Sequence, residues 1–223
     1  MKTTGASSEI PRTPPAIEIL PGQVAGRLDF PLLFGNLRPV EVEVGIGKGR
    51  FLLRESEARP DVNFLGLEWS LKHLRVAKER AERRGLVNVR LYRADARHVI
   101  RELLADGSVS RLHVYCPDPW PKKRHHKRRF FTPEMAPHLE RVLAPGGLLH
   151  LSTDVREYFE EIRGTLRSHS ALLEAENPDR ESPGDDGRTN YEVKYLKAGR
   201  TIHRASYARA HAMPGPAPSR SPR

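Results

Sequence analysis

The segment at residues 115–130, Tyr-Cys-Pro-Asp-Pro-Trp-Pro-Lys-Lys-Arg-His-His-Lys-Arg-Arg-Phe, holds the most chemically informative residues of the chain. Prolines flank Asp118 and Trp120 and fix the backbone φ there, so a carboxylate and an indole stand on a stiff loop. Six Lys or Arg and two His fill residues 122–129. A charge run of this kind is often only a solvated surface. Beside a stiff, carboxylate-bearing loop, however, it is well placed to hold a phosphodiester backbone.

A second candidate is the glycine-rich segment at residues 43–49, Glu-Val-Gly-Ile-Gly-Lys-Gly. Glycines at alternate positions let the backbone turn sharply and approach a ligand closely. A dinucleotide fingerprint would need one more glycine at position 50, where the chain has Arg50. Glu43, ahead of the glycines, would repel a pyrophosphate but could attract a cation. A plain glycine-rich turn remains the alternative.

Two further acids, Glu68 and Asp95, follow predicted strands. Glu68 can accept both ribose hydroxyls of a nucleoside. Asp95 can meet an adenine amino group, or it can simply cap the next helix. Together with Glu43, these acids outline a site for a cationic nucleoside. S-adenosylmethionine, which combines a sulfonium, an ammonium and an adenosine, fits that outline better than NAD.

Hydrophobic periodicity predicts alternating strands and helices that would position these residues. The expected strands are 39–44, 63–68, 89–93, 112–115 and 148–153, and the expected helices are 49–58, 71–84, 96–104, 133–143 and 155–168. Five β-α units in a row predict an α/β fold with a doubly wound, mostly parallel sheet. Residues 189–195 and 201–207 are expected to form a hairpin, which would add an antiparallel C-terminal edge. Ligands of such sheets bind at the carboxyl ends of the strands, where the motifs above lie.

Composition sets broader limits. The 223 residues suit one domain, predicted at 29–211, with a flexible segment at 1–28 and a disordered tail at 212–223. A formal net charge of +10 indicates a polyanionic partner. One cysteine excludes an intramolecular disulfide and favours a reducing, cytoplasmic setting. We expect no membrane span and no metal site, because no apolar run is long enough for a span and His125-His126 lack further ligands at metal-site spacing.

The chain resembles a known family, the bacterial tRNA (guanine-N7-)-methyltransferases of TrmB type, from about residue 33 to about residue 202. The most specific part of the resemblance is Pro-Asp-Pro-Trp-Pro-Lys-Lys-Arg-His-His-Lys-Arg-Arg at 117–129. Residues 43–49, Gly-Leu-Glu at 66–68, Thr-Asp at 153–154 and Thr-Asn-Tyr-Glu at 189–192 agree in order and spacing. The resemblance implies a class I methyltransferase fold and transfer of a methyl group from S-adenosylmethionine to N7 of the variable-loop guanosine, position 46 in tRNA numbering.

The resemblance also assigns residues. It implies donor-site roles for Glu43, Gly45, Gly47, Gly49, Glu68, Asp95 and Asp118, with Asp118 as the catalytic residue nearest the chemistry. It implies tRNA or guanine binding by Lys122, Asp154, Thr189, Asn190, Tyr191 and Glu192. The RNA-contacting loop would comprise Arg124, His125, His126, Lys127, Arg128 and Arg129. The partner would be tRNA, and the sequence leaves monomer and homodimer equally open.

This chemistry needs little machinery. N7 of guanine carries a lone pair and no hydrogen, so it needs no general base. Alignment and electrostatics remain for the protein to supply. Asp118 is expected to orient the guanine through its N–H groups and to favour the positive charge that develops on the ring.

Three other functions stay open at this stage. One is a methyltransferase acting on an exocyclic amine, because Asp118-Pro119-Trp120 loosely resembles the Asp-Pro-Pro-aromatic loop of such enzymes. The second is a dehydrogenase on the same fold, against which Arg50 and Glu43 speak. The third is a catalytically silent RNA-binding protein. Trp120 itself could stack on a base or act as a wedge that holds its loop.

Overall fold

The computed structural model describes residues 17–20, 22, 24, 26–176 and 189–210. They form an eight-stranded sheet with the order β1-β4-β3-β2-β5-β6-β8-β7. The strands are β1 Glu18–Ile19, β2 Val40–Val44, β3 Asn63–Leu67, β4 Val89–Tyr92, β5 Val109–Tyr115, β6 Leu143–Thr153, β7 Leu173–Ala175 and β8 His203–Ala208. The pairs from β1 to β6 are parallel, while β8 runs antiparallel to both β6 and β7. The predicted doubly wound, mostly parallel α/β fold is therefore confirmed.

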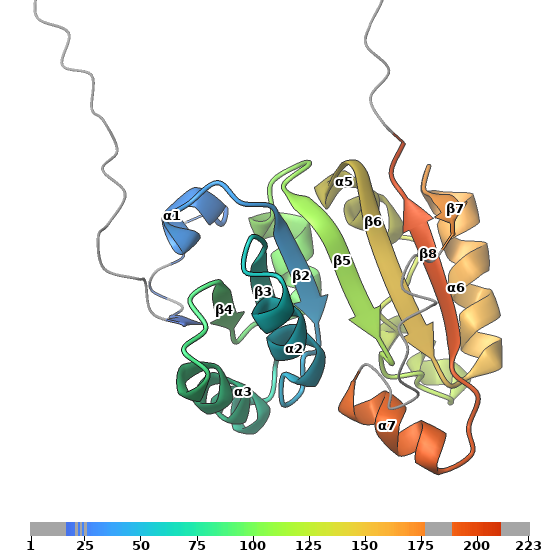
Figure 1. Cartoon of the computed structure of the whole chain (residues 1–223). Helices are drawn as coiled ribbons and strands as arrows, with labels where there is room; N and C mark the ends of the chain where they lie inside the picture. Colours follow the sequence, from blue (N-terminus) through green and yellow to red (C-terminus); the bar gives the residue numbers. More distant parts are fainter. Residues whose placement is uncertain (1–16, 21, 23, 25, 177–188, 211–223) are drawn as a thin grey trace, which may run out of the picture.

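Helices cover both faces of this sheet (Figure 1). They are α1 Phe30–Phe34, α2 Arg50–Ala58, α3 Leu71–Arg83, α4 Ala96–His98, α5 Ala136–Val142, α6 Arg156–His169 and α7 Asn190–Lys197. A π-helical turn, η2 Val99–Leu103, continues α4, and a 3-10 turn, η3 Lys123–Arg128, lies within the basic loop. Strand residues alternate between two cores: Phe64 packs with α2 and α3, and its neighbour Leu65 packs in the core that contains α5 and α6.

The start of α3 shows how local sequence fixes these elements. The Ser70 hydroxyl accepts a hydrogen bond from the backbone N–H of His73 at 3.4 Å and caps the helix, as the sequence predicts. Leu74, Ala77 and Ala81 form the buried stripe against the sheet. Gly85, with φ of 62°, follows the last turn in the left-handed region that favours glycine. The chain therefore leaves β3 at its carboxyl edge and returns toward β4 through a capped helix.

The predicted C-terminal hairpin is wrong in its first half. Residues 189–195 form no strand but begin α7, and β7 pairs with β8 at the edge in their place. Alternating Tyr191, Val193 and Tyr195 resemble a strand, yet a capping box starts a helix at Thr189, whose hydroxyl accepts the Glu192 N–H at 3.1 Å. The second predicted strand exists as β8. In Figure 1, α7 lies across the carboxyl ends of the central strands.

Ordered structure begins before the predicted domain boundary at residue 29. Glu18 and Ile19 form β1 beside β4, and Ile19 and Leu28 are buried. The predicted tail at 212–223 and most of the predicted N-terminal segment lie outside the described residues. Within the described part of the chain, no helix is long and apolar enough to cross a membrane.

Candidate methyl-donor and guanine site

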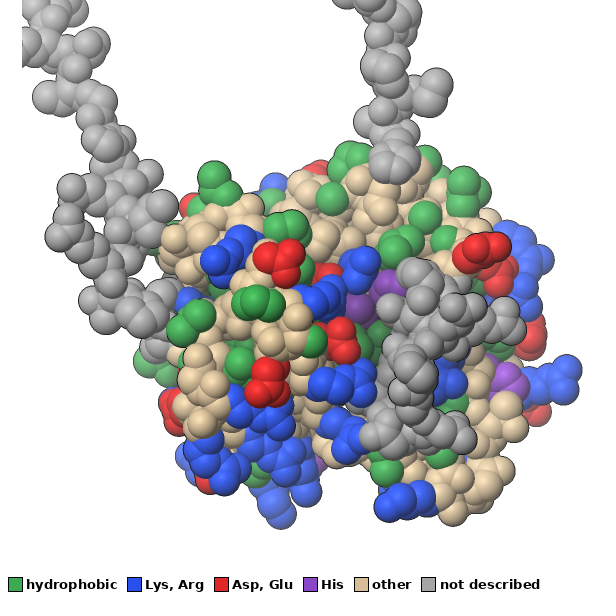
Figure 2. Space-filling model, viewed as in Figure 1, with side chains coloured by type: hydrophobic (Ala, Val, Ile, Leu, Met, Phe, Trp, Pro, Cys, Tyr) green, Lys and Arg blue, Asp and Glu red, His purple; other side chains and the backbone are tan. Residues whose placement is uncertain are grey.

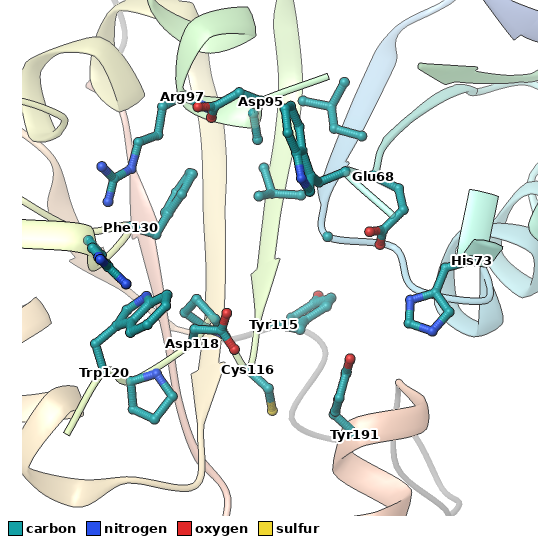
Figure 3. A pocket seen from close by; sticks show the side chains of 18 of the residues that line it. Glu68, His73, Asp95, Arg97, Tyr115, Cys116, Asp118, Trp120, Phe130 and Tyr191 are labelled. Carbon is teal, nitrogen blue, oxygen red and sulfur yellow. The ribbon is translucent and has the colours of Figure 1, made fainter. Parts of the chain in front are cut away.

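A cavity of about 820 Å³ opens at the carboxyl edge of the sheet, where the sequence places the motifs. In Figure 3, Glu68 and His73 lie on one side of it, Asp118 and Trp120 on the other, and Tyr191 reaches in from α7. Eight of the predicted site residues line the cavity: Gly45, Glu68, Asp95, Asp118, Lys127, Arg128, Asp154 and Tyr191. A volume of this size suits a ligand as large as a nucleoside.

Glu68 organises one half of the cavity. Its Oε2 accepts the backbone N–H of Gly47 at 2.8 Å, and its Oε1 accepts the backbone N–H of Ser70 at 2.7 Å. Each carboxylate oxygen keeps a second lone pair for a ligand hydroxyl. Gly47 has φ of 53°, which side chains rarely adopt, so glycine gives the loop its conformation; a Cβ there would make only an ordinary van der Waals contact, 3.9 Å from the Tyr191 ring.

Asp95 lies across this half at the end of β4 and caps α4. Its Oδ1 accepts the Arg97 N–H at 2.9 Å, and its side chain also lines the cavity. The two sequence interpretations, helix cap and ligand contact, are therefore compatible. One oxygen serves the helix, and the carboxylate still has acceptor capacity toward the cavity.

The other half is built by the loop that follows β5. Among the described residues other than glycine, only Cys116 and Trp120 have positive φ, 47° and 42°. These two strained positions bracket Asp118, and strain of this kind collects at functional sites. Burial of Tyr191 raises its pKa, and the nearby charges of Glu68 and Asp118 raise it further. Both carboxylates therefore lie near the Tyr191 ring, and their negative charges disfavour ionisation of its hydroxyl.

Arg129 anchors the same loop from behind. It was expected to contact RNA, but it is only 6% exposed. Its Nε donates to the carbonyl oxygen of Pro119 at 2.8 Å, its Nη1 pairs with Glu161, and its guanidinium lies 4.7 Å from the centre of the Tyr158 ring. Its burial and its internal partners therefore do not support the expected RNA contact at Arg129. Burying a charge is costly unless it is paired, and the Arg129 guanidinium is paired with groups inside the protein.

The rest of the basic loop remains on the surface. Lys122, Lys123, Arg124, Lys127 and Arg128 are exposed, and His125 and His126 are half-buried. Lys127 and Arg128 reach the cavity rim, where the Arg128 guanidinium lies 5.0 Å from the centre of the Trp120 ring. Lys122, Arg124, His125 and His126 do not line the cavity.

Glu43 lies outside the cavity as well. It is 2% exposed, hydrogen-bonds the backbone of Leu52 in the first turn of α2, and supports that helix from below the glycine loop. Burial is the main cause that raises its pKa to about 8. Glu43 is thus mostly uncharged at neutral pH, and its placement does not support the expected direct attraction of a cation. Gly47 and Gly49 shape the loop without lining the cavity.

The segment 189–192 divides its side chains among three surroundings. Tyr191 lines the cavity and Asn190 lines a second hollow on the other side of the glycine loop. Thr189 and Glu192 are buried and cap α7. Glu192 also accepts the Ser152 hydroxyl at 2.8 Å and pairs with Arg204 at 3.5 Å. Successive side chains of a helix point about 100° apart, so these four side chains face different surroundings.

Several cavity residues were missed from the sequence: His73, Arg97, Tyr115, Phe130 and Tyr195. Tyr115 is the last residue of a predicted strand, and the rule that ligands bind at strand ends could have found it. Its hydroxyl lies 3.0 Å from His113 Nδ1. The position of Tyr195 at the cavity depends on α7 being a helix, in which Tyr195 lies one turn after Tyr191, so the predicted strand could not place it there.

Two other features limit the chemistry. Burial raises the pKa of the Cys116 thiol to about 12, so it stays protonated and is no nucleophile. Asp154, predicted to bind substrate, lines the cavity and is paired with Arg200. In the described part of the chain, no group of three or more His, Cys, Asp or Glu could hold a metal ion.

Comparisons with known proteins agree with this geometry. A family model described as "Putative methyltransferase" matches residues 37–205. A tRNA (guanine-N(7)-)-methyltransferase of Geobacillus kaustophilus is 37% identical over 79% of this chain and 82% of its own length. One of Cutibacterium acnes is 36% identical over 90% of this chain and 73% of its own.

Solved structures are similar to this chain in their fold only. The 16S rRNA methyltransferase KamB aligns with a TM-score of 0.59 and 16% identity, covering 81% of this chain and 92% of that one. A 16S rRNA (adenine(1408)-N(1))-methyltransferase from Catenulisporales acidiphilia aligns with a TM-score of 0.56 and 16% identity, over 79% and 88%. The family model and the curated relatives together show that the chain belongs to the tRNA (guanine-N7-)-methyltransferase family.

Proposed function

We propose that the protein transfers the methyl group of S-adenosylmethionine to N7 of the variable-loop guanosine of tRNA, position 46 in tRNA numbering. One observation carries the proposal: a single cavity joins the glycine loop, Glu68 and Asp95 to the strained loop of Asp118, and basic residues form its rim. The curated relatives, named for this activity, support it.

The donor half fits an adenosine with an attached cation. The free lone pairs of Glu68 would accept the ribose hydroxyls, and Asp95 would accept the adenine amino group. Since Glu43 is mostly uncharged and lies outside the cavity, the donor's positive charge would be met by Glu68 and Asp118. When bound, S-adenosylmethionine supplies a methyl group that already carries its own leaving group.

The acceptor half would hold the guanine. Asp118 would accept hydrogen bonds from the N–H groups of the base and stabilise the positive charge that the ring gains on methylation. The indole of Trp120, with Arg128 above it, offers a flat surface beside Asp118. No proton leaves N7, so none of these residues has to act as a base.

The exposed part of the basic loop would hold the RNA backbone. Lys122, Arg124, Lys127 and Arg128 carry charge toward solvent at or near the rim of the cavity. Phosphate contacts of this kind fix register and leave the base in the cavity to specify the site. With one cysteine and a tRNA substrate, we place the protein in the cytoplasm, as a monomer or a homodimer.

The direct test is incubation with labelled donor and unmodified tRNA, followed by digestion to nucleosides. The proposal expects labelled 7-methylguanosine, and none from a tRNA whose variable-loop guanosine is replaced by adenosine. Label on an exocyclic amine would support the rival methyltransferase. If no label is transferred, NADH binding and RNA binding without catalysis are the outcomes to examine.

A further inference from the structure

A second hollow, of about 590 Å³, lies on the outer side of α2 and α3. Seven residues line it: Gly49, Arg50, Leu53, Arg80, Arg83, Arg84 and Asn190. Four of these described lining residues are arginines and none is acidic. Figure 2 shows Lys and Arg side chains gathered over this part of the molecule. A concave surface lined by four arginines suits phosphate, which arginine binds with two parallel hydrogen bonds.

The arginine hollow adjoins the donor cavity. The glycine loop separates the two, since Gly45 lines the cavity and Gly49 lines the hollow. Arg80 is fixed to this loop, because its Nη1 donates to the Lys48 carbonyl oxygen at 3.1 Å. Consecutive residues of α7 divide in the same way, with Asn190 at the hollow and Tyr191 at the cavity. A chain of phosphates in the hollow would therefore run beside a base held in the cavity.

Folding alone does not account for Arg83 and Arg84. Arg84 and Glu57 are 3.2 Å apart, with side chains 42% and 60% exposed. Arg83 and Glu79 are 4.0 Å apart, with side chains 68% and 67% exposed. Exposed pairs of this kind contribute little to stability and are screened by salt. A phosphate could replace either carboxylate as partner at small cost.

We propose that the arginine hollow binds backbone phosphates of the same tRNA whose guanosine enters the cavity, an inference that rests on the proposed function. The basic loop at 122–129 and the arginine hollow then grip the RNA from two sides of the cavity. The loop acts next to the target base, and the hollow acts on a separate stretch of backbone. Arg83 and Arg84 are the contacts best suited to a test, because both are exposed and neither touches the donor cavity.

The test is tRNA affinity as a function of salt for wild type and the double variant Arg83→Ala/Arg84→Ala. Each phosphate contact contributes about 0.7–0.9 to the slope of log affinity against log salt. The double variant should lower the slope by about 1.4–1.8 and raise the KM for tRNA, with kcat at saturating tRNA and the affinity for S-adenosylhomocysteine unchanged. Arg83→Glu/Arg84→Glu should weaken binding further.

The matched control is Arg38→Ala/Arg167→Ala, which removes two exposed arginines, one just before β2 and one in the last turn of α6. The control should keep the wild-type slope. A wild-type slope in Arg83→Ala/Arg84→Ala, or an equal fall in the control, overturns the inference. Should the alanine pair fail to fold, Arg83→Gln/Arg84→Gln keeps the side-chain length and the same expectation. Absence of 7-methylguanosine with wild type would instead count against the proposed function, which the slope does not measure.

Discussion

The carboxylate of Glu68 holds the glycine loop through Gly47, whose backbone N–H donates to Oε2 at 2.8 Å. The other oxygen, Oε1, holds the turn that starts α3 through the N–H of Ser70 at 2.7 Å. Two loops from neighbouring strands are thus fixed to one side chain before any ligand arrives. Preorganisation of this kind improves binding because less ordering is left for the ligand to induce.

Glu68→Ala should weaken donor binding about 10–100-fold. The variant would lose the proposed ribose contact, and one hydrogen bond to a charged group is worth about 1.5–3 kcal/mol, which corresponds to this range. It also leaves the backbone N–H groups of Gly47 and Ser70 without their acceptor. Titration calorimetry with S-adenosylhomocysteine measures the change. Glu57→Ala, an exposed acid on α2, is the control and should bind normally. Wild-type affinity in Glu68→Ala would show that Glu68 has no part in the donor site.

Asp118→Ala should lower kcat about a hundredfold at saturating donor and tRNA. A preorganised electrostatic partner of the transition state is worth about 3 kcal/mol. Asp118→Asn keeps the shape and removes the charge, so a similar loss there would identify the charge as the important property. Single-turnover methylation measures the chemical step. Turnover at the wild-type rate in Asp118→Ala would end the assignment.

Exposed and buried basic residues of the loop at 122–129 should behave differently in experiments. Arg124→Ala/Lys127→Ala removes exposed charges, so the salt slope of tRNA binding should fall by about 1.4–1.8 with little change in Tm. Arg129→Ala should instead lower Tm, because it leaves Glu161 and the Pro119 carbonyl oxygen without their partner. Thermal melts and salt titrations of both variants decide the point. A stable Arg129→Ala protein with a reduced slope would return Arg129 to the RNA surface.

The buried acid Glu43 should make stability depend on pH. Its pKa is about 8 in the folded protein against an ordinary 4.5, so the folded state holds a proton that the unfolded chain releases. Its contribution to stability is therefore full below about pH 4.5 and is lost as pH rises through about 8. Glu41, whose pKa is lowered to about 2, is ionised in both states above pH 5 and adds no slope there.

Glu43→Gln should flatten this dependence. The amide is uncharged at every pH, and its oxygen can still accept a hydrogen bond from the Leu52 backbone. Relative to wild type, the variant should gain stability between pH 5.5 and 8, by up to a few kcal/mol at about 1.4 kcal/mol per pKa unit. Urea unfolding at both pH values measures this. Parallel pH profiles for wild type and Glu43→Gln would contradict it.

Glu192→Ala should destabilise the fold by about 2–3 kcal/mol, since it removes a helix cap and leaves the buried Ser152 hydroxyl without its acceptor. Its tRNA salt slope should stay at the wild-type value, because a fully buried side chain touches no phosphate. Lys197→Ala, exposed on the same helix, is the control for Tm. A raised KM for tRNA with normal stability would instead support the prediction that Glu192 takes part in tRNA or guanine binding.

The alternation of strands and helices and the place of the site follow from short-range information. Strands and helices alternate in period, Ser70 and Gly85 mark the ends of α3, and acids or glycines follow each strand. Because parallel strands bring their carboxyl ends to one edge, Glu68, Asp95 and Asp118 had to meet there. Their meeting depends only on the strands being parallel.

The errors lie where one sequence pattern fits two structures. Tyr191, Val193 and Tyr195 alternate as in a strand, but the cap between Thr189 and Glu192 makes the segment a helix. Arg129 belongs to a run of cations like any surface patch, and only the fold brings Glu161 and the Pro119 carbonyl to it. Its burial could not be read from its neighbours in the chain.

The sequence by itself determined the parallel α/β architecture, the family and the edge of the sheet that carries the chemistry, because each depends on local period and on residues close together in the chain. Only the tertiary structure decided which charges are available to a ligand. Glu43 and Arg129 are buried, while Arg83 and Arg84 are exposed beside the glycine loop. The physical reason is that desolvation and pairing, which set the state of a charged group, come from segments far apart in the sequence.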